Sequence, residues 1–248
     1  MRIPGEMTER YFVDHEIGPS HVSLEGPEAH HLAHVMRAKV GDEVTLFDGS
    51  GAEFLARIQH MGRSQARLEV LVRRPIDREL AFQLTLGVAL PRGDRQRWLV
   101  EKATELGVGE LVPLLTARTT ARPDDGARAR LERTVIEASK QCGRNRLMRI
   151  GEPCELASYL RNTPPDALRV VAHPLQAATE RAARPGDLLR APSVYVTVGP
   201  EAGFTDGEIE LAIGHGWQLV DLGPRVLRVE TAVLALGSVI VLGRCLFE

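Results

Sequence analysis

The N-terminal part of the chain contains short stretches in which hydrophobic and polar positions alternate, at 43–47, 53–58 and 66–72. Alternation with a period of two predicts half-buried β-strands. The Asp-Gly-Ser-Gly sequence at 48–51 separates two of these stretches and has the turn chemistry of a hairpin. In this part, helical spacing of hydrophobic residues occurs only at 28–39. The pattern predicts a small N-terminal domain that resembles a β-barrel.

Beyond a linker at 73–77, predicted strands alternate with predicted helices. A strand pattern at 82–90 is followed by helical spacing at 98–106. Further strands are predicted at 111–115, 168–172, 194–198 and 218–222. Such alternation is typical of a parallel sheet covered by helices. We therefore predict an α/β domain at 74–248 that follows the β-barrel domain at 1–73.

The composition places the chain among ordinary globular proteins, with 248 residues, 44% hydrophobic and 26% charged. Three cysteines without a Cys-x-x-Cys pair argue against a disulfide framework, and we expect a reducing, cytoplasmic location. The first ten residues have acidic side chains and no apolar core, so we expect no secretory signal. The longest apolar stretch, 231–242, is shorter than the roughly 20 residues that cross a bilayer, and we expect a buried helix there.

Basic residues are unevenly distributed, although the net charge is only -2. The segment 118–149 holds nine basic and four acidic residues, and 57–78 holds six arginines and two acids. Nucleic-acid-binding surfaces have this character, and so do solvated helix faces. The charge pattern alone leaves both readings open.

Three predicted strands each run into a loop rich in Gly and Pro, at 173–174, 199–204 and 223–231. In open α/β sheets, ligands bind outside the carboxyl ends of the strands. Thr205 and Glu208 have the spacing of a capping box, and free amides at that helix start are candidates to face the ligand. The Gly patterns that hold a pyrophosphate are missing from this region, which argues against a dinucleotide oxidoreductase and favours a cofactor poor in phosphate.

Two other constellations carry less weight. His30, His31 and His34 are close in sequence, but adjacent residues point to different faces and no Cys or carboxylate has recognisable zinc spacing. Cys142 has no identifiable base partner, as a nucleophile requires. We therefore predict no metal site and no cysteine nucleophile.

The two late loops and the residues around them resemble the motifs of a known protein family. The sequences GPEAGFTDGEI at 199–209 and LGPRVLRVETA at 222–232 resemble the two signature motifs of the RsmE family, bacterial 16S rRNA uridine-N3 methyltransferases of the SPOUT superfamily. Similar segments occur in the same order at 31–37, 41–43, 47–49, 101–107 and 137–146. The resemblance covers nearly the whole chain. Ala202 and Val233 depart from it, because the family usually has Gly at the first position and a smaller residue at the second.

The resemblance implies a PUA-like RNA-binding barrel at 1–73 and a trefoil-knotted SPOUT methyltransferase domain at 74–248. It also implies a homodimer, S-adenosylmethionine as cofactor, and methylation of N3 of a uridine in 16S ribosomal RNA. Two alternatives stay open at this point. One is a ribose 2'-O-methyltransferase of the same superfamily, and the other is an RNA-binding module without catalytic activity.

The roles of individual residues follow from the motifs. Arg228 is the first candidate to stabilise the uridine anion and Arg225 the second, while Glu201 and Glu230 are candidates to accept the N3 proton or to orient an arginine. An Arg–Glu pair that merely braces the loop is the structural alternative. The cofactor-binding candidates are His173, Val198, Gly199, Pro200, Gly203, Leu222, Gly223, Val226 and Leu227. The RNA-binding candidates are Arg10, Arg37, Arg92, Gln141, Arg144 and Arg146.

Overall fold

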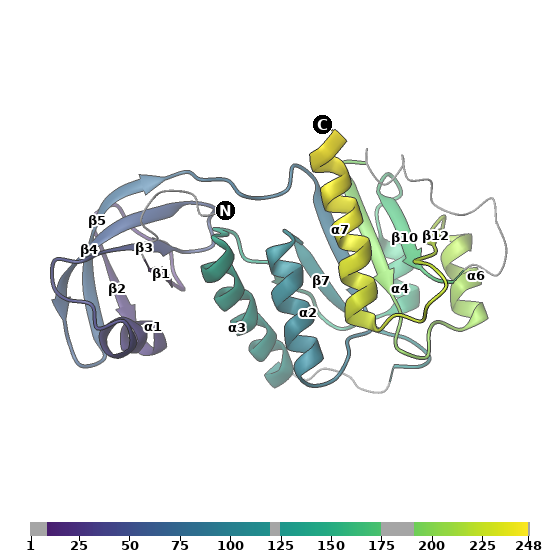
Figure 1. Cartoon of the computed structure of the whole chain (residues 1–248), viewed down its shortest axis with the longest axis horizontal. Helices are drawn as coiled ribbons and strands as arrows, with labels where there is room; N and C mark the ends of the chain where they lie inside the picture. The colour runs from purple at the N-terminus through teal and green to yellow at the C-terminus, as the bar shows by residue number, and fades with distance from the viewer. Residues whose placement is uncertain (1–8, 120–124, 175–190, 248) are drawn as a thin grey trace. The chain divides into compact units, whose positions relative to one another are not determined.

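The computed structural model describes residues 9–119, 125–174 and 191–247 (Figure 1). The chain forms two compact units, one of Met1–Glu79 with Ser139–Leu147 and the other of Leu80–Ala138 with Met148–Glu248. The sequence pattern predicted a single boundary after residue 73, whereas the structure also brings 139–147 back to the N-terminal unit. The expectations for the first eight residues and for Arg122 lie outside the described residues.

The N-terminal unit is built on a five-stranded sheet with the order β1-β3-β4-β5-β2. Its strands are β1 (Arg10–Phe12), β2 (His21–Glu25), β3 (Glu43–Phe47), β4 (Glu53–Met61) and β5 (Gln65–Arg74). β1 pairs with β3 in parallel, and the other pairs are antiparallel. Leu46, Ile58 and Leu68 are buried in its core. The predicted strands and the hairpin at 48–51 are confirmed, and in that turn Ser50 N donates to Asp48 Oδ1 over 3.0 Å.

The helical segment of this unit is shorter than its sequence pattern predicted. It consists of α1 (Gly26–His30) and a π-helical turn, η1 (His31–Val35). Arg37 follows with a φ of 54°, the only positive φ of a non-glycine residue in the described ranges. Ala38 N donates to Leu32 O over 3.1 Å, a backbone bond between residues six positions apart that closes the end of this segment. Arg37 thus ends the helix in a conformation that usually selects glycine.

The second unit is built on a parallel sheet with the order β12-β10-β11-β6-β7-β8, and β9 pairs with β7. The strands are β6 (Gln83–Val88), β7 (Glu110–Leu115), β8 (Arg149–Ile150), β9 (Cys154–Glu155), β10 (Leu168–Ala172), β11 (Ser193–Val198) and β12 (Gln218–Val220). The predicted α/β domain with a parallel sheet is therefore confirmed. The carboxyl ends of β10, β11 and β12 lie together at one edge, because Ala172 pairs with both Val198 and Val220.

Helices pack against both faces of this sheet (Figure 1). They are α2 (Asp94–Glu105), α4 (Leu156–Asn162), α6 (Asp206–Gly214) and α7 (Val229–Phe247), while α3 (Asp125–Cys142) begins in this unit and its last residues, 139–142, belong to the N-terminal unit. α2 and α7 contact each other, and so do α4 and α6. Gly87 of β6 faces Tyr159 of α4, and a Cβ at this position would lie 2.7 Å from the tyrosine ring. Close approach of helix and strand therefore requires glycine there.

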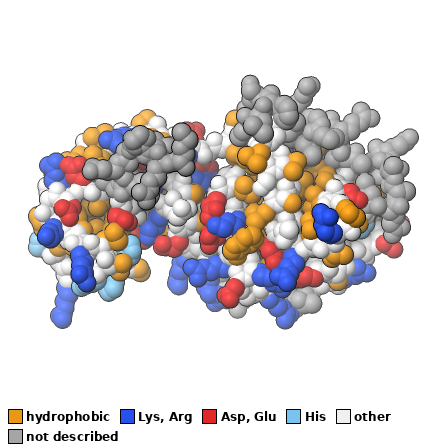
Figure 2. All heavy atoms as spheres, in the orientation of Figure 1, with side chains coloured by type: hydrophobic (Ala, Val, Ile, Leu, Met, Phe, Trp, Pro, Cys, Tyr) orange, Lys and Arg blue, Asp and Glu red, His pale blue; other side chains and the backbone are white. Residues whose placement is uncertain are grey.

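α7 differs from the helix predicted at 231–242, because only one of its faces is buried. Val233, Leu236 and Ile240 are buried, while Val239 and Leu242 are each 56% exposed. Hydrophobic side chains gather over α2 and α7 on the face shown in Figure 2. Over the described residues, the helices are too short or too polar to cross a membrane.

Candidate cofactor and catalytic site

The loops after β10, β11 and β12 form one cleft with a volume of about 540 Å³. All nine predicted cofactor-binding residues line it: His173, Val198, Gly199, Pro200, Gly203, Leu222, Gly223, Val226 and Leu227. Segments far apart in sequence meet here because their strands are parallel neighbours and end at the same edge. The cleft is confirmed as a structural feature, and the role of these residues in binding a cofactor stays a prediction.

The loop at 199–204 is held by a turn and by one buried aromatic ring. Gly203 has a φ of 71°, and its N–H donates to Pro200 O over 2.8 Å. Phe204 is buried, and its ring lies 3.1 Å from where a Cβ on Gly199 would stand. Ala202 has no positive φ, so its departure from the family's glycine costs no backbone strain here.

The predicted capping box is present at the start of α6. Glu208 N donates to Thr205 Oγ1 over 3.3 Å, and Thr205 N donates to Glu208 Oε2 over 2.8 Å. These two amides are therefore satisfied within the cap, and the expectation that free amides at this helix start face a ligand stays a prediction. The other carboxylate oxygen of Glu208 accepts from Ala117 N over 2.8 Å. The cap thus ties the loop after β7 to the edge of the cleft.

Arg118 supports the loop at 199–204. Its Nη1 donates to Ala202 O over 2.6 Å and to Phe204 O over 3.4 Å, and the residue also lines the cleft. The sequence pattern had placed it only within a basic run. A guanidinium that holds two carbonyl groups of one loop fixes the path of that loop.

Arg95 is a functional candidate that the sequence pattern missed. Its Nη2 lies 3.1 Å from Glu201 Oε1, and its Nη1 lies 3.9 Å from Glu230 Oε2. The Glu201 side chain is 52% exposed and lines the cleft, whereas that of Glu230 is 8% exposed in the first turn of α7. β6 pairs with β11, so the residues after β6 reach the same sheet edge as the loop at 199–204. Once the order of the strands is known, the position of Arg95 after the end of β6 places it at this edge. The sequence alone does not give that order.

Two of the four predicted catalytic residues line the cleft. Glu201 and Arg225 do so, whereas Arg228 is exposed outside it and Glu230 is buried behind Arg95. Arg228 O accepts the bond from Ala232 N over 2.9 Å, which places Arg228 directly at the start of α7. Glu230 Oε2 is buried and makes no hydrogen bond within the described residues.

His173 is the ionisable ring of the cleft. Burial lowers the pKa of His173, and the nearby carboxylates of Asp206 and Asp221 oppose that change. The imidazole is therefore neutral at pH 7 and adds no positive charge beside the site. Its backbone N–H donates to Val220 O over 3.0 Å, which fixes the loop after β10 to β12.

The predicted RNA-binding residues separate into two groups. Arg37, Arg92, Gln141 and Arg146 are exposed. Arg144 is only 4% exposed, and its guanidinium is paired with Glu79, with Nε 3.1 Å from Oε1. Contact between Arg144 and RNA stays a prediction, and the commitment of its side chain to a buried ion pair argues against it.

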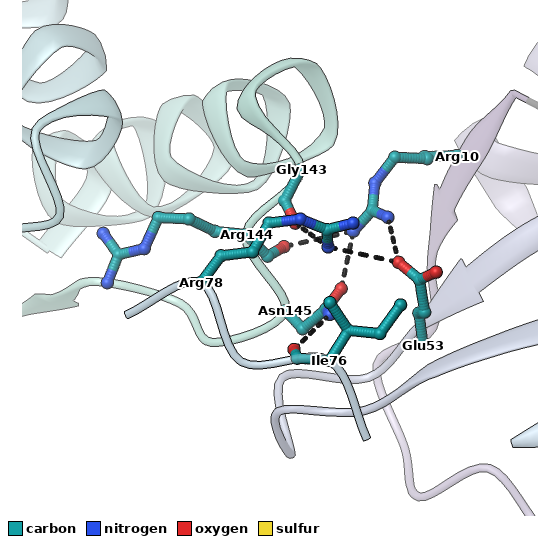
Figure 3. A network of polar contacts seen from close by, with 7 residues as sticks. All are labelled: Arg10, Glu53, Ile76, Arg78, Gly143, Arg144 and Asn145. Carbon is teal, nitrogen blue, oxygen red and sulfur yellow. Dashed lines mark hydrogen bonds and ion pairs between the residues drawn. The ribbon is translucent and has the colours of Figure 1, made fainter. Parts of the chain in front are cut away.

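Arg10 also belongs to an internal network (Figure 3). It donates to Glu53 over 2.9 Å, to Asn145 Oδ1 over 2.7 Å and to Arg144 O over 3.2 Å. Arg78 reaches Glu53 over 3.2 Å and Gly143 O over 2.8 Å. These contacts hold 143–145 in the N-terminal unit. RNA binding by Arg10 stays a prediction, and the engagement of its guanidinium in this network argues against it.

The two weaker constellations have structural explanations. The rings of His30 and His34 lie with centroids 4.6 Å apart and planes tilted by 46°, and His31 contacts Tyr11. Within the described ranges, His, Cys, Asp and Glu side chains do not gather into a metal-binding group. Cys142 is partly buried at the end of α3.

Comparison with known proteins agrees with this architecture. Residues 78–241 match the RNA methyltransferase domain family, and residues 24–71 match the RNA methyltransferase PUA domain family. Ribosomal RNA small subunit methyltransferase E of Synechocystis is 33% identical, with 85% of this chain and 69% of that protein covered. The protein of the same name from Bacillus subtilis is 29% identical, with 91% of this chain and 93% of that protein covered.

Solved structures show the same likeness. The Neisseria gonorrhoeae ribosomal RNA small subunit methyltransferase E bound to S-adenosyl methionine has a TM-score of 0.84 and 30% identity, covering 96% of this chain and 98% of its own. A putative methyltransferase of Legionella pneumophila, also with bound cofactor, has a TM-score of 0.86 and 31% identity, covering 95% and 98%. The fold is that of an RNA methyltransferase with a PUA domain. Within that class, the chain belongs to the ribosomal RNA small subunit methyltransferase E family, which confirms the resemblance of its motifs.

Proposed function

We propose that this protein transfers the methyl group of S-adenosylmethionine to N3 of a uridine in small-subunit ribosomal RNA, in the cytoplasm. The observation that carries the proposal is the single cleft at the ends of β10, β11 and β12, because all nine residues that the motifs assign to the cofactor line it. Two relatives of the same fold, matched over 98% of their own chains, are described with this cofactor bound.

The lining of the cleft suits such a cofactor. A volume of about 540 Å³ is within the range of small-molecule sites, roughly 300 to 1,000 Å³. Val198, Leu222 and Leu227 provide apolar walls for a flat heterocycle, and the glycines between them leave backbone groups accessible. The carboxylates of Glu201 and Asp221 are the acidic groups in the lining and would attract a positively charged sulfonium. When bound, S-adenosylmethionine supplies an electrophilic methyl group.

The residues of this chain then align the uridine and accept its N3 proton. Glu201 lines the cleft and is free to accept the N3 proton on its outer carboxylate oxygen, while Arg95 fixes its position. With the cofactor bound, N3 would lose its proton to Glu201, and its lone pair would take the methyl group that the cofactor supplies, which would leave the cofactor as a neutral thioether. To Arg225 in the lining, and to Arg228, which is exposed outside it at the start of α7, we assign donation to the uridine oxygens, which carry the negative charge before transfer.

The proposal includes two features of the SPOUT superfamily. One is a trefoil knot in the catalytic domain. The other is a homodimer in which the outer face of α7 packs against a second copy. Val239 and Leu242 on that face, and Trp98 on the adjacent α2, are exposed hydrophobic residues. Contiguous hydrophobic surface of this kind marks interaction sites.

Nucleoside mass spectrometry of ribosomal RNA, from cells with and without the gene, tests the reaction. We expect N3-methyluridine to disappear from small-subunit RNA when the gene is deleted and to return with the purified enzyme and cofactor. Loss of a 2'-O-methyl nucleotide instead would identify a ribose methyltransferase. RNA binding without any methyl transfer, and without heat of cofactor binding, would leave only an RNA-binding module.

A further inference from the structure

The tip of the β4–β5 hairpin holds a second cleft, with a volume of about 400 Å³. Its lining consists of His60, Gly62, Arg63, Ser64, Gln65 and Arg67. The chain from Phe54 to Leu68 contains three arginines and no acidic residue. None of these six residues lines the cofactor cleft or belongs to the network in Figure 3.

The hairpin brings basic side chains from both strands to one place. His60 and Arg67 are directly opposite each other in the antiparallel register, so their side chains share a face of the sheet. Gly62 N donates to Gln65 O over 2.8 Å and closes the turn that carries Arg63 and Ser64. The cleft is thus lined by two guanidinium groups, an imidazole, a hydroxyl and an amide. All of the residues that carry these groups are exposed to solvent.

Neither arginine of this cleft has a counter-ion. Elsewhere in the unit, Arg10, Arg57, Arg78 and Arg144 are each paired with a glutamate. Among the described residues, no carboxylate lies within ion-pair distance of Arg63 or Arg67. The acids nearest along the strands are already engaged, because Glu25 accepts from Gln65 over 2.9 Å and Glu69 accepts from Gln59 over 3.2 Å. Both guanidinium groups of the cleft are therefore without an ion-pair partner among the described residues, and Glu25, which bonds to Gln65, is the carboxylate joined to the lining.

We propose that this hairpin cleft, through Arg63 and Arg67, binds phosphate groups of the RNA backbone. The inference deepens the proposed function, because it names a second RNA contact away from the methyl-transfer site. Guanidinium groups match phosphate geometry through paired N–H donors. A hydroxyl, a histidine and a glutamine beside them add the neutral donors that commonly accompany arginine at phosphate contacts.

The test measures how salt affects binding of a labelled small-subunit ribosomal RNA fragment to the full-length protein. For R63A/R67A we expect the slope of log K against log salt to shrink by about 1.4 to 1.8, because each phosphate contact removes about 0.7 to 0.9. R63K/R67K keeps both charges and should keep most of the slope. The matched control is R57A/R161A, which removes two exposed positive charges from other places, and we expect it to change the slope by less than half as much.

Three outcomes would overturn the assignment. An unchanged slope for R63A/R67A would show a solvated hairpin, and an equal effect of R57A/R161A would show a response to total charge. Saturable binding of inorganic phosphate at micromolar concentration would show a site for a free anion instead of RNA. Cofactor binding by calorimetry and nucleoside mass spectrometry test the proposed reaction separately, so its failure is distinguishable from failure of the hairpin contact.

Discussion

Arg95 and Glu201 meet at 3.1 Å although they come from different elements, the first turn of α2 and the loop after β11. The same guanidinium lies 3.9 Å from Glu230 in α7. Arg95 thus links two of the segments that carry predicted catalytic residues. Because Arg95 and Glu201 are both about half exposed, the pair itself contributes only about 0 to 1 kcal/mol of stability. Its importance is therefore in orientation of the Glu201 carboxylate.

Replacing Arg95 with alanine should slow methyl transfer more than it weakens binding. We expect kcat to fall by about tenfold to hundredfold, since small displacements of a reacting group have effects of that size. KM for the cofactor should change little, whereas the melting temperature should fall, because Glu230, whose side chain is only 8% exposed, loses its ion-pair partner. Arg95→Lys should recover part of the activity, because one ammonium can reach one carboxylate but not both. Steady-state kinetics that show normal kcat for Arg95→Ala would remove Arg95 from the mechanism.

Arg228 at the start of α7 allows a separate test of anion stabilisation. Arg228→Lys keeps the charge but loses the planar set of donors, so turnover should fall by about tenfold to a thousandfold. Arg228→Ala should be no more active than the lysine variant. Cofactor affinity by calorimetry should stay within a few fold, because a group engaged only in the transition state contributes little to ground-state binding. Joint loss of cofactor affinity and thermal stability would show instead that Arg228 braces the loop.

Arg144 and Arg146 are close in sequence, but the structure assigns them opposite roles. Arg144→Ala should lower the free energy of unfolding by about 1 to 3 kcal/mol, because it leaves Glu79, whose side chain is 20% exposed, without its partner. Arg146→Ala removes an exposed group and should leave stability within about 0.5 kcal/mol while reducing the salt slope of RNA binding by about one unit. Urea denaturation and fluorescence anisotropy measure the two effects. If Arg144→Ala instead lowered the salt slope of RNA binding and left stability unchanged, Arg144 would be an RNA contact.

The outer face of α7 provides a test of the proposed homodimer. Replacing Val239 and Leu242 with aspartate should produce a monomer at micromolar concentration, because charges placed in an apolar interface are not compensated. Light scattering measures the change. The matched control is Val226→Asp, which replaces a hydrophobic residue that is 96% exposed in the loop before α7. A wild-type protein that is monomeric under these conditions would contradict the dimer directly.

Local patterns predicted much of the fold and the outline of the site. The period of two identified the strands, and the spacing of Thr205 and Glu208 identified the helix start, because these signals depend on residues close in sequence. The three strand-end loops could be brought together because parallel strands end at one edge. The contacts of Arg95 and Arg144 could not be predicted from the sequence, because each arginine pairs with a residue far along the chain. An exposed and a buried arginine have the same appearance in a sequence.

Arg37 gives the sharpest test of function against stability in this chain. Its φ of 54° is costly for any residue with a Cβ, and glycine would relieve about 0.5 to 1 kcal/mol of that cost. The exposed side chain gives no compensation through burial, so we infer that it is retained for contact with RNA. Arg37→Gly should therefore raise the free energy of unfolding while lowering the salt slope of RNA binding by about one unit. Arg37→Ala is the matched control, because it should weaken RNA binding equally without the gain in stability. If Arg37→Gly is more stable and binds RNA as the wild type does, the arginine at this cap has no role in RNA recognition.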